Sequence, residues 1–247
     1  PIYLRSMHGP LGGPVLVLGP NNFPFAFNGI AGGDFTAAVA AGNPVIAKAH
    51  PAHPYTSLLL AQAAAEAAQA SGLPSGAVQM FFHTSNALGL RMVADPRTAA
   101  VAFTGSRPAG MAIKAAADAA GTPAYLEMSS VNPVFVLPGA LAQRGPAIAA
   151  ELAASCAMGA GQFCTRPGVT VLPPGEHAEA FVQEMQRLTA ATRAGVLLTA
   201  RAPESVGEAV GALRAAGAEL LAGGQVAADA AGYAFQPTLL KVSGSRF

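Results

Sequence analysis

Cys164 and Glu127 are the residues whose types and surroundings could carry out covalent chemistry. Cys164 ends the sequence GQFC at 161–164, where glycine-rich backbone lets a substrate approach a nucleophilic sulfur closely. Glu127 follows an apolar segment in a chain with 13 acidic residues, and a carboxylate there can act as a general base through one water molecule. Together the two groups suit chemistry that proceeds through an acylated thiol.

Each of these residues also has an ordinary structural interpretation. A free cysteine is among the residue types most often buried, and most glutamates face solvent or cap a helix. Cys156, the second cysteine, lies in an apparent helix with small apolar neighbours and is assigned to the core. On the residues alone, Cys164 as a structural thiol and Glu127 as a solvent-facing residue therefore stay open.

The elements that must position these residues follow from the apolar pattern of the first half. Short apolar runs closed by Gly, Pro, Asn or Ser predict buried strands at 14–18, 44–47, 78–82 and 100–103. Stretches of helical composition lie between or after these runs, at 34–41, 55–71 and 107–120. This alternation predicts an α/β fold whose parallel sheet is covered on both faces, with ligands beyond the carboxyl ends of its strands.

The second half of the chain predicts a further α/β unit. An apolar run at 131–137 comes first. Helices are expected at 146–160, 176–191 and 203–216, and strands at 169–172 and 219–221. We place the boundary between the two domains at 130/131.

Composition and charge exclude several classes of partner. Charged residues make up 11% of the chain, against about 25% in an average soluble domain. Lys and Arg total 14 and Asp and Glu total 13, without clusters, which argues against nucleic acid and against an anionic membrane surface. Because no apolar run approaches the length of about 18 residues, no membrane span is expected. A small-molecule partner remains.

Cysteine usage and the start of the chain indicate a compartment. Two cysteines at 156 and 164 resemble neither a disulfide framework nor a metal site, so we predict a reducing, cytoplasmic location and no metal. The chain begins at Pro1 without a basic-then-apolar leader, so no secretory signal is expected.

Five segments occur in an order that resembles the aldehyde dehydrogenase superfamily. They read GPNNFP at 19–24, PVIAK at 44–48, FTGS at 103–106, LEMSSVNP at 126–133 and GQFC at 161–164. The resemblance implies a Rossmann-like NAD(P)-binding domain over 1–130, lacking its N-terminal part. It also implies an α/β catalytic domain over 131–247, lacking its C-terminal part.

The same resemblance implies roles for three site residues. Cys164 corresponds to the nucleophile, and Glu127 to the general base that activates the deacylating water. Asn22 corresponds to the oxyanion-hole amide, which acts together with the backbone N–H of Cys164. In place of the family's usual Leu-Glu-Leu-Gly-Gly, the chain reads LEMSS at 126–130. This variant resembles the ketoglutarate-semialdehyde (2,5-dioxovalerate) dehydrogenase branch.

A dinucleotide site is implied by the resemblance alone, since no GxGxxG sequence follows the first strand. The residues that it places near the cofactor are Pro20, Asn21, Lys48, His50, Gly105 and Ser106. Lys48 would hydrogen-bond the adenosine ribose, and Gly105 and Ser106 would meet the pyrophosphate. The alternatives are Asn21 as a turn residue, Lys48 as a solvated lysine after a strand, Ser106 as a helix cap, and His50 and His53 as ordinary loop residues.

Residue 51 bears on the choice of cofactor. Many NAD-preferring relatives carry a Glu three residues beyond the lysine, and this chain has Pro51 there. With Lys48, His50 and His53 nearby, we expect NADP or NAD, with a preference for NADP. The sequence HTSNALG at 83–89 is less glycine-rich than in relatives, which alters the adenosine side of the site.

The function implied is NAD(P)-dependent oxidation of an aldehyde to a carboxylic acid through a cysteine thiohemiacetal and a thioester. The branch that the chain resembles suggests a keto-acid semialdehyde as the substrate. Glu127 separates this reaction from CoA-acylating relatives. One alternative is a catalytically incomplete cofactor-binding fragment, because relatives extend past both ends of the chain. Another is a Cys/Glu thiol hydrolase that needs no cofactor. The full-length protein is expected to be a homodimer or homotetramer.

Overall fold

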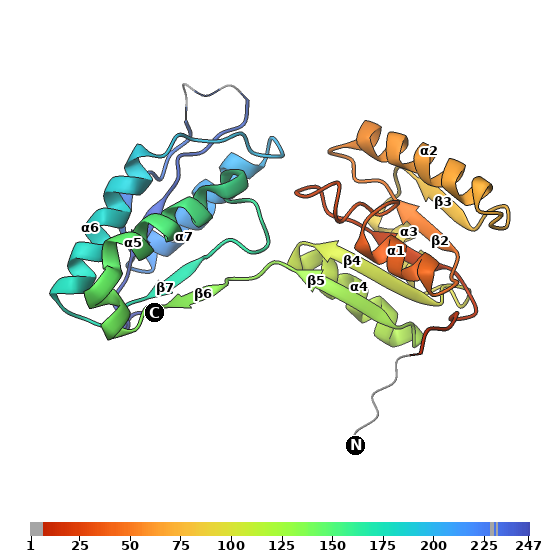
Figure 1. Cartoon of the computed structure of the whole chain (residues 1–247), viewed down its shortest axis with the longest axis horizontal. Helices are drawn as coiled ribbons and strands as arrows, with labels where there is room; N and C mark the ends of the chain where they lie inside the picture. Colours follow the sequence, from red (N-terminus) through yellow and green to blue (C-terminus); the bar gives the residue numbers. More distant parts are fainter. Residues whose placement is uncertain (1–6, 228–229, 231) are drawn as a thin grey trace, which may run out of the picture. The chain divides into compact units, whose positions relative to one another are not determined.

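The computed structural model describes residues 7–227, 230 and 232–247, so the first six residues of the predicted N-terminal domain lie outside it. The chain divides into two compact units, Pro1–Ser129 and Ser130–Phe247. The first unit contains one sheet and the second contains two smaller ones, and each unit has its own hydrophobic core (Figure 1).

The first unit is built on a five-stranded sheet with the strand order β3-β2-β1-β4-β5, in which every neighbouring pair is parallel. The strands are β1 (Val15–Leu18), β2 (Val45–Lys48), β3 (Val78–Phe81), β4 (Ala100–Gly105) and β5 (Ala124–Met128). The predicted α/β fold with a parallel sheet is confirmed. β5 was not assigned from the sequence, because its side chains alternate between half-buried and exposed and form no continuous apolar run.

Helices cover both faces of this sheet (Figure 1). They are α1 (Gly33–Ala40), α2 (Pro54–Ala70), α3 (Asn86–Val93) and α4 (Arg107–Ala120). Successive strand residues point to opposite faces. Val17 therefore packs in the cluster that includes residues of α1 and α2, and Leu16 in the cluster that includes residues of α3 and α4.

Helix α3 begins within the segment 83–89, which is less glycine-rich than in relatives. Its eight residues form a helix because Ser85 caps the N-terminus, with its Oγ accepting a hydrogen bond from the Leu88 amide at 3.2 Å. Buried Val93 then anchors the other end of the helix in the core. The sequence 83–89 is thus partly helical.

The second unit contains α5 (Pro138–Ala157), the short 3-10 turn η1 (Met158–Gly161), α6 (Glu176–Ala191) and α7 (Ala202–Ala215). β6 (Pro133–Phe135) pairs in parallel with β7 (Val169–Val171), and β8 (Glu219–Ala222) pairs antiparallel with β9 (Leu239–Lys241). Its main core lies between α5 and α6, where Leu141, Leu152, Phe181 and Met185 are buried.

The helix expected at 146–160 was wrong at both ends. α5 begins at Pro138 and contains a break at Arg144, where φ is −145° and ψ is 27°. Pro146 follows this break and so opens a second helical segment, a place that tolerates a residue without an N–H. The helix ends at Ala157 because the backbone then turns left-handed, with φ of 58° at Gly159.

Candidate functional site

Most of the predicted site residues of the first unit lie at the carboxyl edge of its sheet. Asn21 and Asn22 follow β1, Lys48 is the last residue of β2, and Gly105 is the last residue of β4. β1 lies between β2 and β4, so the strand order reverses here, and loops that follow strands on either side of such a reversal commonly bind ligands. The parallel sheet therefore gathers these residues at one edge.

The loop after β1 is held by a buried polar network that the sequence did not reveal. The Asn28 side chain is 2% exposed; its Oδ1 accepts from the Ile30 amide at 3.0 Å, and its Nδ2 donates to Ser57 Oγ at 3.3 Å. Ser57 Oγ lies 3.2 Å from His53 Nδ1, and His53 Nε2 lies 3.3 Å from the Pro20 carbonyl oxygen. The carbonyl can only accept, so Nε2 is the donor and Nδ1 accepts from Ser57.

This network connects the first loop to the start of α2. His53 was interpreted from the sequence as an ordinary loop residue, yet its ring contacts the residue next to Asn21. The sequence offers little indication of this role, because Pro20 is 33 residues away from His53 along the chain. The other partner, Ser57, is four residues away. The network fixes the course of the segment on which Asn22 lies.

Lys48 and His50 form a partly desolvated pair of basic groups after β2. Lys48 Nζ donates to the Ala49 carbonyl at 3.1 Å, and burial lowers its pKa. Burial first, then His53 and Lys48, lower the pKa of His50 to about 4. His50 is therefore neutral at pH 7, and its Nδ1 accepts from the Ala52 amide at 3.1 Å. Positive charge at this position comes from Lys48.

Gly105 ends β4, and Ser106 follows it directly before α4, as the sequence predicted. Ser106 occupies the N-cap position of the 14-residue helix, but its side chain makes no capping hydrogen bond. Capping by its hydroxyl therefore does not explain this serine. A Cβ at Gly105 would lie 2.6 Å from the Phe103 ring, so a larger residue would require that ring to move. The amides of the first turn of such a helix suit a pyrophosphate.

Glu127 lies within edge strand β5, not in the loop after it. It is exposed and pairs in register with Thr104 of β4. Its carboxylate is near enough to Asp34, in the first turn of α1, that it raises the Asp34 pKa together with the larger effect of desolvation. Glu127 thus caps no helix, and its exposure leaves the carboxylate open to water.

Cys164 belongs to the second unit, whereas Asn22 and Glu127 belong to the first. It is exposed, as a nucleophile requires. Three consecutive residues before it have left-handed backbone, with φ of 58° at Gly159, 56° at Ala160 and 74° at Gly161. Such backbone is costly for a non-glycine residue, so Ala160 carries strain four residues before Cys164.

Side chains far away in the sequence hold the segment around Cys164. Its carbonyl oxygen accepts from Ser130 Oγ at 2.8 Å and from Asn132 Nδ2 at 2.6 Å. Gln162 Oε1 accepts from the Leu198 amide at 2.9 Å, which ties the same turn to a third segment. Ser130 and Asn132 lie in the motif at 126–133, but the motif alone predicts no role for either residue. The replacement of the usual Gly-Gly by Ser-Ser is the sequence feature that could have indicated the role of Ser130.

Cys156 differs from Cys164 in its surroundings. It is half-buried, packs against the core of the second unit, and its Sγ lies 3.5 Å from the Pro167 carbonyl oxygen. Burial raises the pKa of its thiol. Both features fit the structural role assigned to Cys156 from the sequence.

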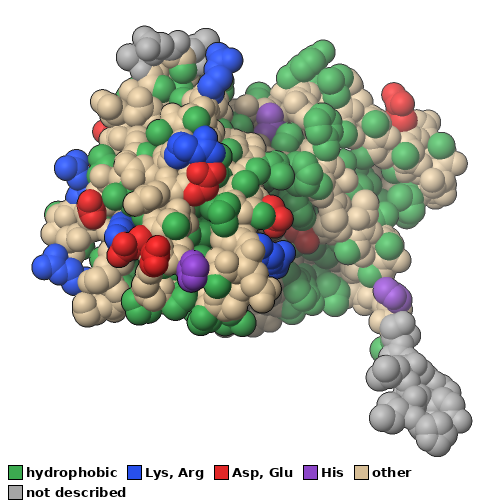
Figure 2. All heavy atoms as spheres, turned by 60° about the vertical axis from the view of Figure 1, so that its left-hand side comes forward, with side chains coloured by type: hydrophobic (Ala, Val, Ile, Leu, Met, Phe, Trp, Pro, Cys, Tyr) green, Lys and Arg blue, Asp and Glu red, His purple; other side chains and the backbone are tan. Residues whose placement is uncertain are grey.

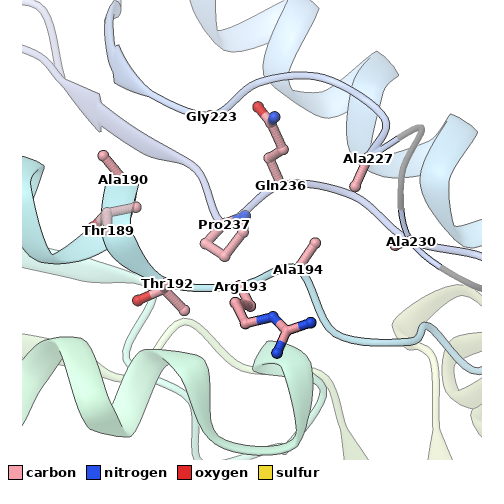
Figure 3. Close-up of a pocket in the computed structure, with 10 residues that line it drawn as sticks. All are labelled: Thr189, Ala190, Thr192, Arg193, Ala194, Gly223, Ala227, Ala230, Gln236 and Pro237. Carbon is pink, nitrogen blue, oxygen red and sulfur yellow. The ribbon is translucent and has the colours of Figure 1, made fainter.

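A separate cavity of about 410 Å³ lies in the second unit. Figure 3 shows that residues at the end of α6, with Arg193, and a segment with Gln236 and Pro237 line it. None of the predicted site residues is among its lining residues. It therefore adds no group to the predicted chemistry.

The charged side chains of the surface are mixed in sign. On the face shown in Figure 2, Lys and Arg side chains lie among Asp and Glu side chains. Within the described residues, no group of three or more His, Cys, Asp or Glu could hold a metal ion. In that same part of the chain, no helix has the length and apolar character needed to span a membrane.

Comparison with known proteins agrees with this geometry. A family model described as "Aldehyde dehydrogenase family" matches residues 3–245. The chain therefore belongs to the aldehyde dehydrogenase family, which confirms the resemblance inferred from the five motifs.

Two curated relatives carry the name of the predicted branch. The chain is 44% identical over 189 residues to alpha-ketoglutaric semialdehyde dehydrogenase 2 of Azospirillum brasilense, covering 76% of this chain and 36% of that protein. It is 45% identical over 186 residues to alpha-ketoglutaric semialdehyde dehydrogenase of Acinetobacter baylyi, covering 74% and 34%. The chain thus spans about a third of the length of these relatives.

Solved structures share the fold. Glyceraldehyde-3-phosphate dehydrogenase of Methanocaldococcus jannaschii, solved in complex with NADP, superposes with a TM-score of 0.79 at 23% identity. The match covers 96% of this chain and 51% of that one. At this identity the similarity establishes the arrangement of the chain and nothing about its ligands.

The buried network predicts a specific loss of stability. Asn28→Ala leaves the Ile30 amide buried without its acceptor, so the free energy of unfolding should fall by about 1–3 kcal/mol. Urea denaturation measures this. Asn21→Ala, at a half-exposed position in the same loop, is the matched control and should change little. Equal losses in the two variants would contradict the assigned network.

The low pKa of His50 predicts how stability depends on pH. The unfolded chain binds a proton at His50 near the ordinary pKa of 6.5, whereas the fold binds it only near 4. Stability therefore falls as pH falls from 6.5 to 4. His50→Gln keeps an acceptor for the Ala52 amide and removes this part of the decline. Urea midpoints at neutral pH and at about pH 4.5 measure it. An unchanged decline in the variant would show that His50 does not contribute.

Proposed function

We propose that the protein oxidises an aldehyde to a carboxylic acid with NAD(P), and that Cys164 is its nucleophile. The observation that carries this proposal is the exposed Cys164 thiol, held after a left-handed turn in a chain of the aldehyde dehydrogenase family. A thiol that is solvent-accessible and fixed by hydrogen bonds to its own peptide suits attack on a carbonyl carbon. The relatives' names favour a keto-acid semialdehyde as substrate.

Each proposed residue performs one task in this reaction. The Cys164 thiolate forms a bond to the aldehyde carbon, and the carbonyl oxygen becomes an oxyanion that accepts from the Asn22 amide and the Cys164 N–H. A bound nicotinamide nucleotide supplies the acceptor for the hydride that the substrate carbon loses. Glu127 then takes a proton from the water that attacks the thioester carbon, and the C–S bond breaks to return the thiolate.

The first unit fits a dinucleotide on several counts. The N-terminus of α4, where the Ser106 side chain makes no capping hydrogen bond, suits the pyrophosphate, and Gly105 directly precedes it. Lys48 provides a positive charge and hydrogen-bond donors for the ribose. Pro20 and Asn21 lie in the loop that follows β1, at the same edge of the sheet.

We further propose a preference for NADP. Pro51 leaves no carboxylate to repel a 2′-phosphate, and Lys48 supplies positive charge nearby. Because His50 is neutral at pH 7, we assign it a hydrogen-bonding role toward the cofactor and not a charge. A homodimer or homotetramer and a cytoplasmic location stay predictions for the full-length protein.

Substitution of the two proposed catalytic residues tests the reaction. Cys164→Ala should abolish NADPH formation from α-ketoglutaric semialdehyde, measured by absorbance, because no thiohemiacetal can form. Glu127→Gln should lower steady-state turnover by about 10²–10⁴-fold while retaining a burst of one nucleotide per site, since hydride loss precedes hydrolysis. Cys156→Ala is the matched control and should remain active.

Three results would contradict the proposal in different ways. Turnover that survives Cys164→Ala removes the nucleophile. Hydrolysis of an activated ester that depends on Cys164, without aldehyde oxidation or nucleotide binding, indicates the cofactor-free thiol hydrolase. Thermal stabilisation by NADP without any turnover indicates a cofactor-binding fragment.

Substitution at residue 51 tests the cofactor preference. Pro51→Glu places a carboxylate three residues beyond Lys48, so it should weaken NADP binding by about tenfold or more through like-charge repulsion and spare NAD. Ratios of kcat/KM for the two nucleotides measure the effect. Pro51→Gln is the control for the change in backbone and size. Equal losses for both nucleotides would mean that residue 51 does not face the 2′ position.

A further inference from the structure

Four hydrogen bonds connect the segment 130–132 to the segment that carries the nucleophile. Ser130 Oγ and Asn132 Nδ2 both donate to the Cys164 carbonyl oxygen, at 2.8 and 2.6 Å. Asn132 Nδ2 also donates to the Arg166 carbonyl at 3.0 Å, and the Gly168 amide donates to the Val131 carbonyl at 2.7 Å. We call this set of contacts the carbonyl clamp.

The clamp satisfies the acceptor capacity of one particular carbonyl. A carbonyl oxygen has two lone pairs, and here each can accept from a different side chain. Two donors from different backbone positions restrict the rotation of the Cys164–Thr165 peptide plane. A restrained peptide plane limits the ψ angle of Cys164. It thereby limits the direction of the Cα–Cβ bond from which the thiol projects.

The residues of the clamp fit this task. Asn132 has φ of 48°, and asparagine is among the few non-glycine residues that tolerate left-handed backbone. Its amide thereby reaches two carbonyls at once. Ser130 occupies a place where many members of the family have a glycine, so its hydroxyl provides a donor that a glycine lacks. The serine at position 130, which replaces the usual glycine, thus has a structural role.

The clamp is on the surface, which separates its effect on geometry from its effect on folding. Ser130 and Cys164 are exposed. Loss of the Ser130 hydroxyl leaves a carbonyl that water and Asn132 can satisfy, so no buried polar group loses its partner. A change in the rate of thiol chemistry without a loss of stability is therefore expected of this residue.

We infer that Ser130 and Asn132 are positioning residues that orient the Cys164 nucleophile through its own carbonyl. The inference rests on the proposed function for the identity of the reaction, and on the hydrogen bonds alone for the orientation of the thiol. Small misplacements of a nucleophile cost large factors in rate, because the attack needs a narrow geometry. The effect should appear in the rate of attack and not in substrate binding.

Variants at Ser130 test the inference in aldehyde oxidation. Ser130→Ala should lower kcat by about tenfold and change the KM for the aldehyde by less than about twofold. Ser130→Thr keeps the hydroxyl and should restore kcat to within about threefold. Ser129→Ala removes the neighbouring hydroxyl and is the matched control. The thermal midpoints of all these variants should agree with that of the unsubstituted protein.

A second readout does not depend on aldehyde oxidation. Acylation of Cys164 by p-nitrophenyl acetate forms a thioester and releases p-nitrophenolate, so its burst rate reports the thiol alone; peptide mass spectrometry assigns the acylated cysteine. Ser130→Ala and Asn132→Gly should slow this burst by about tenfold, and Ser130→Thr should not. Asn132→Gly preserves the left-handed backbone and removes both side-chain bonds.

The outcomes distinguish the two proposals. If the unsubstituted protein does not oxidise aldehydes but the burst slows in Ser130→Ala, the proposed function fails and the positioning role stands. If the burst rate of Ser130→Ala matches that of the unsubstituted protein, the positioning role is overturned. The same follows if Ser129→Ala slows the burst equally, or if Ser130→Thr fails to restore it.

Discussion

The parallel sheet of the first unit is buried on both faces, and most of the candidate site follows from that constraint. Val45 and Val101 are fully buried, and Val17 is 1% exposed. Interior strand positions of this kind cannot carry unpaired polar groups, because desolvating them is costly. Polar side chains are therefore displaced to the strand ends and to the loops that follow. Since all five strands are parallel, these loops lie at one edge, where Asn22, Lys48 and Ser106 are found.

The two units hold their candidate residues by different means. The loop after β1 depends on a buried network in which Asn28 and Ser57 are 2% and 0% exposed. Such a network contributes to folding and fixes the loop at the same time, because a missing partner would leave a desolvated donor or acceptor. The segment around Cys164 depends on exposed hydrogen bonds from Ser130 and Asn132 to the Cys164 carbonyl. Exposed hydrogen bonds add little to folding, because water can replace a lost partner.

Parts of the fold could be read directly from the sequence, and others could not. The strands around Val17, Val45 and Val101 are continuous apolar runs between turn residues, which is the pattern of strands buried on both faces. β5 was missed because it lies at the sheet edge and exposes every second residue, Tyr125 and Glu127 among them. The early start of α5 was missed because Pro146 resembles a helix start, and the break at Arg144 that makes it one is a feature of packing.

The sequence by itself determined the family, the α/β class and the identity of the candidate residues, because motif residues are recognisable by type and order. Cys164, Glu127 and Asn22 each lie in one of these motifs. Tertiary structure alone decided their surroundings: the neutral state of His50, the link from His53 to Pro20 and the two donors on the Cys164 carbonyl. These features join residues more than 30 positions apart or depend on burial. Neither distance nor desolvation is encoded in local sequence, since both arise only when the chain folds and brings separate segments into contact.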